Sequence, residues 1–211
     1  MALSTRPTLE VAEILRAHAA AYTSRHRISL EQARVLRRLA ACRTAVLGGH
    51  VDACGDCGYQ RISYNSCRDR HCPKCQGTKR AAWLEARLER LLPIEYFHVV
   101  FTLPEALKPL VLHNQRQLYD LLFRAAAQTL LTLAADPRRL GAQIGFTALL
   151  HTWGQNLLFH PHLHCVVTGG GLSKDGERWI STRPGYFLPV KVLGRLFRGK
   201  SARHRLPCPI P

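Results

Sequence analysis

The sequence predicts an α+β protein in two parts: an α-helical N-terminal segment with a cysteine-rich ribbon, followed by an α+β domain. Three observations lead to this fold class. Helical periodicity runs through much of residues 8–47, two C-x-x-C pairs lie within residues 54–75, and runs rich in β-branched and aromatic residues begin after Pro93. We therefore expect domains over residues 1–92 and 93–200, with a tail over residues 201–211.

Helices are expected on both sides of the cysteine-rich ribbon. Residues 8–21 have helical periodicity, and Ser29 followed by Gln32 forms a capping box that opens a helix to about Leu47. After the ribbon, "GTKRAAWLEARLERLLP" (residues 77–93) is typical of a helix that its last proline closes.

Strands and helices are both expected after residue 93. The segment "IEYFHVVFTLP" (residues 94–104) is typical of a buried strand, and a helical stretch then runs to about Ala135 with a break at Pro109. The remaining elements are predicted as strands over residues 142–154 and 161–169, a turn over 173–179 and a short helix over 189–198.

Charge indicates the partner of the protein more than its fold. The chain has 211 residues and a formal net charge of +16, so a polyanion is the natural partner and nucleic acid is the commonest one. We see no secretory signal and no apolar run near the roughly 20 residues of a membrane span, which predicts a cytoplasmic protein associated with the nucleoid through DNA. Thiols stay reduced there, so clustered cysteines indicate metal ligands and not disulfides.

The cysteine-rich ribbon has the spacing of a zinc site. Cys54 and Cys57 form one C-x-x-C pair, and Cys72 and Cys75 form a second one after fourteen intervening residues. Two such pairs supply the four thiolates of a structural, tetrahedral zinc site. Cys67 and His71 are alternative ligands, and His50 is a further one. Whether one or two ions bind is left open.

Basic and aromatic residues alternate along the same ribbon, which favours contact with DNA. Tyr59 and Tyr64 are the aromatic residues. The basic residues that we expect to bind DNA are Arg61, Arg68, Arg70, Lys74, Lys79 and Arg80. The alternative is a solvated face of the ribbon that binds nothing.

Histidines recur at every second position in "FHPHLHCVVTGGG", at residues 160, 162 and 164. Residues i and i+2 of a strand share a face, so His162 and His164 project side by side and can bind one metal ion, with Leu163 directed to the core. His160 is expected to lie outside the ligand set. The alternative is a pair of partly exposed histidines on an edge strand.

These motifs resemble the HUH endonucleases, and most closely the rolling-circle insertion-sequence transposases that have a tyrosine pair and an N-terminal zinc-binding domain. The resemblance rests on "YNSCRDRHCPKCQ" at 64–76, "FHVVFTLP" at 97–104, "HPHLHCVVTGGG" at 160–171 and "YFLPVKVLGRLFRGK" at 186–200. It implies an antiparallel sheet flanked by helices, with the histidines on a central strand. Late elements of that sheet are expected to be missing here.

The resemblance also implies a reaction. One magnesium or manganese ion, held by His162, His164 and a third polar ligand, polarises a phosphate of single-stranded DNA at the ends of the element, and a tyrosine attacks it to form a 5′-phosphotyrosine link. For the third ligand we favour Gln155 over His151.

The nucleophile departs from the family pattern. Of the six tyrosines only Tyr186 follows the histidine motif; it lies beside Gly185, is not expected on a helix and is expected to pack in the core. The resemblance ends near Lys200, where a proline-rich tail begins, so we expect a truncated or frameshifted transposase without its catalytic tyrosines. The alternative function is a zinc-dependent DNA-binding remnant without catalytic activity. A hydrolase unrelated to DNA would explain neither the charge nor the zinc ribbon.

Overall fold

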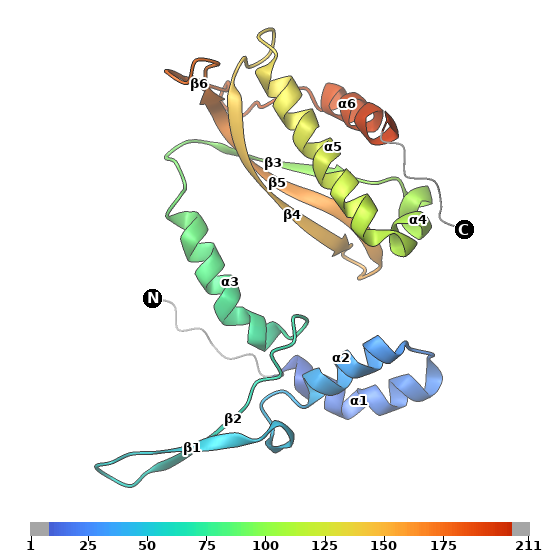
Figure 1. The fold of residues 1–211 in the computed structure, drawn as a ribbon, viewed down its shortest axis with the longest axis vertical. Coiled ribbons are helices and arrows are strands. Elements are labelled where there is room, and N and C mark those ends of the chain that lie inside the picture. The colour runs from blue at the N-terminus through green and yellow to red at the C-terminus, as the bar shows by residue number, and fades with distance from the viewer. Residues whose placement is uncertain (1–8, 204–211) are drawn as a thin grey trace. The chain divides into compact units, whose positions relative to one another are not determined.

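The computed structural model describes residues 9–203, which form two compact units with their boundary in the chain between Leu91 and Leu92 (Figure 1). The first holds helices, a small hairpin and a cysteine cluster, and the second holds an antiparallel sheet with helices. The predicted α+β class is therefore confirmed. In the predicted tail, residues 201–203 are helical, and residues 204–211 lie outside the described residues.

The first unit begins with two helices that both start at capping boxes. α1 (Val11–Arg25) is capped by Glu10 and Glu13. α2 (Leu30–Ala40) is capped by Ser29 and Gln32, the capping box that the sequence predicts. α2 ends earlier than expected: Arg43 takes a left-handed conformation (φ 56°) and donates its backbone N–H to the Asn65 carbonyl. The chain then forms a short 3₁₀ turn, η1 (Ala45–Leu47), so residues 41–47 are a bend and not a continued helix.

A hairpin and a third helix complete this unit. β1 (Gly49–Ala53) pairs antiparallel with β2 (Gln60–Tyr64), and nearly all of their residues are exposed. α3 (Pro73–Leu88) begins at Pro73, earlier than expected, because the first turn of a helix tolerates a residue without a backbone N–H. Cys72 is thereby placed at the N-cap and Cys75 in the first turn.

The second unit is built on a sheet with the strand order β3-β5-β4, all antiparallel. These strands are β3 (Tyr96–Thr102), β4 (Gln143–Trp153) and β5 (Phe159–Leu172), and the short β6 (Trp179–Ser181) pairs with the far end of β5. The histidine motif therefore lies on the central strand, and the edge-strand alternative is wrong.

Helices cover one face of this sheet (Figure 1). The segment after β3 forms η2 (Glu105–Leu107), α4 (Lys108–His113) and α5 (Gln115–Ala135), and α6 (Val190–Arg203) follows β6. The predicted break at Pro109 is displaced to Asn114, because Pro109 occupies the first turn of α4, where its missing N–H costs nothing.

The core lies between these helices and the inward face of β5. Leu163, Cys165 and Val167 are completely buried there, against Leu122 and Leu130 of α5. Since side chains alternate along a strand, His162, His164 and Val166 project from the opposite face. That face is more open: Val166 is 39% exposed, and Val100 and Leu149 on the neighbouring strands are 43% and 38% exposed.

The triple glycine at the end of the histidine motif is required by close packing of the backbone. A Cβ at Gly169 would lie 2.6 Å from the Glu95 carbonyl oxygen, and a Cβ at Gly171 would overlap the Gln143 carbonyl. Because these glycines have no side chain, the neighbouring backbone can approach them closely. Over residues 9–203, no helix combines the length and apolar character needed to cross a membrane.

Candidate metal centres and nucleic-acid interface

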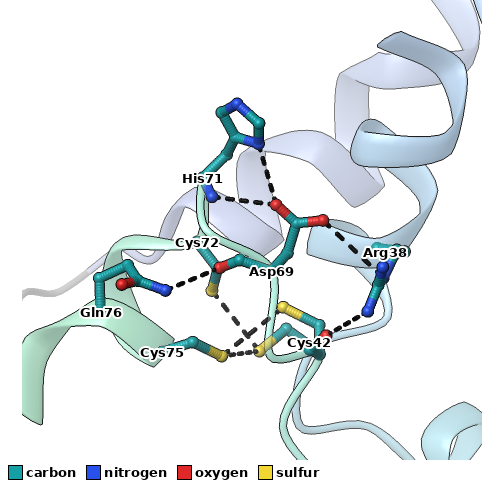
Figure 2. Close-up of polar contacts among 8 residues, drawn as sticks. Arg38, Cys42, Asp69, His71, Cys72, Cys75 and Gln76 are labelled. Carbon is teal, nitrogen blue, oxygen red and sulfur yellow. Dashed lines mark hydrogen bonds and ion pairs between the residues drawn. The ribbon is translucent and has the colours of Figure 1, made fainter. Parts of the chain in front are cut away.

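Four cysteine thiols converge in the first unit (Figure 2). They are contributed by the bend after α2, the loop after β2 and the start of α3, and they are Cys42, Cys67, Cys72 and Cys75. The Sγ atom of Cys42 lies 3.5 Å from that of Cys75 and 3.6 Å from that of Cys72, and the Sγ atoms of Cys67 and Cys75 are 3.6 Å apart.

These distances fit a tetrahedral zinc site. Four thiolates at a Zn–S distance of about 2.3 Å lie about 3.8 Å from one another, only slightly farther apart than the thiols here. Leu15, Val35, Leu39 and Leu47 pack around the cluster and keep water away from it. A closed site of four thiolates leaves no position for a substrate, which is typical of a structural zinc ion.

Asp69 holds the loop that carries two of these cysteines (Figure 2). Its side chain is 9% exposed; it accepts hydrogen bonds from the backbone N–H of His71 (2.9 Å) and contacts that residue's Nδ1 (3.0 Å). These bonds lower the pKa of the Asp69 carboxyl. Arg38 of α2 lies 3.8 Å from the carboxylate and donates to the Cys67 carbonyl at 2.9 Å, so it ties α2 to the cysteine loop.

Without a cation, the four thiols cannot all ionise. Burial raises the pKa of Cys67 to about 12 and also raises that of Cys42. Burial acts in the same direction on Cys75, but hydrogen bonds from the three neighbouring thiols outweigh it and lower its pKa to about 7. A bound zinc ion would replace the protons of these thiols and balance the negative charge of the thiolates.

The predicted grouping of the cysteines differs from the one in the structure. Cys72 and Cys75 join the alternative Cys67 and a residue that the sequence analysis missed, Cys42. Cys54 and Cys57 are instead exposed in the turn between β1 and β2. Cys42 belongs to no C-x-x-C pair; its only sequence signal was its place at the end of an amphipathic helix. The other alternative, His71, directs its Nδ1 to Asp69.

The basic residues predicted to bind DNA are mostly exposed. Arg61 lies on β2, Arg68 and Arg70 lie in the cysteine loop, and Lys79 and Arg80 lie on α3. Lys74 is the exception, because its Nζ atom binds both carboxylate oxygens of Glu10, at 2.6 and 2.8 Å.

A second group of ligands lies on the open face of the sheet in the second unit. His151 of β4 stands directly opposite His162 of β5, and His164 follows two residues later on the same face. One ligand nitrogen from each lies within 4.8 Å of the other two. The Nε2 atoms of His162 and His164 are 2.9 Å apart, close to the spacing of about 3 Å between two nitrogens that share one ion at about 2.1 Å.

Two features prepare these imidazoles to bind a metal. The Nδ1 atom of His162 lies 2.6 Å from the carbonyl oxygen of His160; a carbonyl only accepts, so Nδ1 carries the proton and Nε2 presents its lone pair to the cluster. Burial, followed by the charge of neighbouring histidines, lowers the pKa of His151 and of His164, which favours the neutral form that a metal requires.

Two further predicted residues lie elsewhere. Gln155, favoured as the third ligand, is exposed in the turn between β4 and β5, while His151 is the residue that joins the pair. Tyr186 precedes α6, outside any helix as expected, but it is 48% exposed, so its predicted burial in the core is wrong. Its neighbour Phe187 is the buried residue and stacks on Phe97 at 5.4 Å.

Two known protein families match this chain. The family described as "Transposase zinc-binding domain" matches residues 14–103, and the family described as "Putative transposase" matches residues 145–206. The chain is 60% identical over 196 residues to "Putative transposase y4qJ" of Sinorhizobium fredii, a match that covers 92% of this chain and 49% of that protein. The chain belongs to this transposase family.

A second relative of this chain is named for an insertion sequence element. The "Transposase for insertion sequence element IS801" of Pseudomonas savastanoi pv. phaseolicola is 39% identical over 141 residues, which are 66% of this chain and 33% of the relative. The chain spans about half, or less, of the length of these two relatives. No solved structure matches it. The zinc-binding domain and the cluster of four cysteines together support a structural zinc ion in this chain.

Proposed function

We propose that this transposase chain carries the metal centre at which an HUH-type rolling-circle transposase nicks and joins single-stranded DNA. One observation carries the proposal: His151, His162 and His164 direct ligand nitrogens to one point on the open face of a sheet. A divalent ion bound there would polarise a scissile phosphate. The chain itself lowers the pKa of His151 and of His164, orients His162 through its contact with the His160 carbonyl, and leaves the face accessible to a DNA strand.

The donor set favours one of the two expected ions. Imidazole nitrogen suits transition-metal cations, whereas magnesium prefers oxygen ligands and near-ideal octahedral geometry. With three nitrogen donors and no carboxylate among them, the centre fits manganese better than magnesium. We therefore propose manganese, or a similar transition-metal cation, as the ion that this centre takes.

We propose DNA as the partner and single-stranded ends of the element as its form. The net charge of +16 gives a strong, salt-dependent attraction to phosphates. Arg61, Arg70 and Arg80 are exposed in the zinc-binding unit and are candidates to contact the DNA backbone. Lys74 is not among them, because Glu10 already neutralises it.

The zinc ligands that we propose are Cys42, Cys67, Cys72 and Cys75, which satisfy a tetrahedral site without any other residue. Cys54 and Cys57 form a separate, exposed pair in the turn between β1 and β2, so any zinc that they bind is a second ion. The zinc content of cysteine variants distinguishes this pair from the group of four.

The alternative function is a DNA-binding remnant without chemistry. The exposed Tyr186, with no helix around it, favours this alternative for the chain taken alone. A phosphotyrosine intermediate would then not form on this chain.

Cleavage of single-stranded oligonucleotides tests the proposal. The chain is incubated with manganese and oligonucleotides taken from the ends of the element, and the products are run on a denaturing gel. Because no tyrosine on a helix follows the histidines in residues 9–203, we expect no covalent product from this chain. We expect DNA binding that weakens steeply with salt. Substitution of His162 and His164 should weaken that binding only in the presence of manganese.

Two results would change this assignment. A covalent protein–DNA band that disappears in Tyr186→Phe would make this chain a working nuclease with an unexpected nucleophile. Manganese binding that is unchanged in a His162→Ala, His164→Ala double variant would contradict the metal centre and favour the DNA-binding remnant.

A further inference from the structure

A fourth imidazole lies beside the three-histidine centre. The Nε2 atom of His98 is 2.7 Å from the Nδ1 atom of His164, and the two rings stack with their centroids 5.0 Å apart and their planes 7° from parallel. The sequence analysis gave His98 no role, although it lies in the "FHVVFTLP" segment.

The register of the sheet explains this contact. Val100 of β3 stands directly opposite His164 of β5. His98 comes two residues before Val100, so it shares the face of the sheet and is the diagonal neighbour of His164, within reach of a long side chain. The histidines of β4 and β5 thus gain a neighbour from the third strand of the sheet.

The two ring nitrogens of His164 face different partners. Its Nε2 atom points to Nε2 of His162, at 2.9 Å, on the side where the ligand atoms converge. Its Nδ1 atom points to His98. His162 is arranged in the same way, with Nε2 in the cluster and Nδ1 on the carbonyl of His160. A histidine that binds a metal usually donates its other ring N–H to such an outer partner, which fixes its tautomer and orientation.

We propose that His98 is a positioning residue for the metal centre: its Nε2 accepts the Nδ1 proton of His164 and thereby holds the Nε2 lone pair of His164 toward the ion. The proposal rests on the metal centre proposed above. In the metal-bound chain it assigns the proton of His164 to Nδ1 and the proton of His98 to its own Nδ1, on the exposed side of the sheet.

The same geometry argues against His98 as a fourth ligand. Its Nε2 atom contacts the nitrogen of His164 that points away from the cluster, and among residues 9–203 the group of converging ligand atoms contains His151, His162 and His164 but not His98. One nitrogen cannot both accept the Nδ1 proton of His164 and bind an ion at the Nε2 side of that ring.

Manganese affinity of the whole chain tests the proposal, measured by calorimetry and by electron paramagnetic resonance of the free ion. We expect His98→Ala to weaken binding about 10–100-fold, the usual effect of losing an outer partner of a metal ligand. His98→Gln supplies an amide oxygen that accepts the same proton, so it should restore affinity to within about threefold, while His164→Ala should abolish binding. His113→Ala, an exposed histidine on α4, is the matched control and should bind as the unsubstituted chain does.

The proton position on His164 gives a second, spectroscopic readout. In the metal-free chain Nε2 of His162 only accepts, so the 2.9 Å contact requires His164 to donate from Nε2. A diamagnetic cation such as zinc at the centre moves that proton to Nδ1, and in ¹⁵N spectra we expect this change at a lower zinc concentration in the unsubstituted chain and in His98→Gln than in His98→Ala. Unchanged zinc content and circular dichroism establish that each variant is folded.

Three results would overturn the proposal. Manganese affinity and a metal-driven change of the His164 tautomer that are both unaffected by His98→Ala would remove the positioning role. Loss of binding in His98→Ala and His98→Gln as complete as in His164→Ala would make His98 a direct ligand. Absence of manganese binding by the unsubstituted chain would overturn the metal centre itself, and the proposal for His98 with it.

Discussion

His151 and His162 face each other directly across β4 and β5, although eleven positions separate them in the sequence. The turn at residues 154–158 brings the two strands back alongside each other. This pairing supplies the third imidazole of the centre and leaves Gln155 at the exposed turn.

The pairing predicts that His151, and not Gln155, is a direct ligand of the ion. His151→Ala should abolish manganese binding or weaken it more than about 100-fold, because it removes one of three ligands and not an outer partner. Gln155→Ala should leave the affinity unchanged. Calorimetric titration with manganese measures both, and the reverse ranking of the two variants would restore Gln155 as the third ligand.

Zinc content separates the two groups of cysteines. Cys42→Ser should lose its zinc to a chelator at a concentration that leaves the unsubstituted chain loaded, because three thiolates no longer close the tetrahedral site. Since binding to a structural zinc site contributes to folding, the thermal midpoint of the first unit should fall as well.

The matched control is the Cys54→Ser, Cys57→Ser double variant, which changes two exposed cysteines of the same unit. It should retain the zinc held by the buried cluster. If this double variant loses all of its zinc, the ligands are the ones that the C-x-x-C spacing predicts: Cys54, Cys57, Cys72 and Cys75.

Zinc binding should release protons. Below pH 9 the pKa of Cys67, raised to about 12, and the raised pKa of Cys42 keep both thiols protonated in the metal-free chain, so binding at pH 8 must displace at least these two protons. The stability that zinc contributes is therefore present at high pH and is lost as the pH falls. We expect the affinity to fall at least about 100-fold per pH unit, a slope of two or more protons, in chelator competition at several pH values between 7 and 9, and more steeply below pH 7, where Cys75 is protonated as well. A slope near zero would mean that the thiols are already ionised without metal.

The triple glycine offers a test of the sheet. Gly169→Ala should destabilise the second unit by about 1–3 kcal/mol, because its Cβ would lie 2.6 Å from a backbone oxygen that cannot move independently. Gly145→Ala on β4 is the control: the nearest atom to its Cβ is a methyl of Thr168 at 3.5 Å, an ordinary contact. Chemical denaturation compares the two, and equal stability would mean that the sheet relaxes around Gly169.

Much of the fold could be predicted from local signals. The capping box at Ser29 and the alternating strand around His162 are short-range patterns whose physics acts within a few residues. The errors at Leu47 and Pro109 concern where an element ends, which depended on a bond from Arg43 to Asn65 and on the turn at Asn114.

The sequence by itself predicted a metal site among the cysteines and a second one at a pair of histidines on one face of a strand. Only the tertiary structure decided which side chains lie together: Cys42 and not the hairpin pair joins Cys67, Cys72 and Cys75, His151 and not Gln155 joins His162 and His164, and His98 lies beside His164. The reason is physical. A spacing of two or three residues fixes which neighbours can share one ion, whereas the remaining ligands come from other strands and helices, and their approach is set by strand register and by packing.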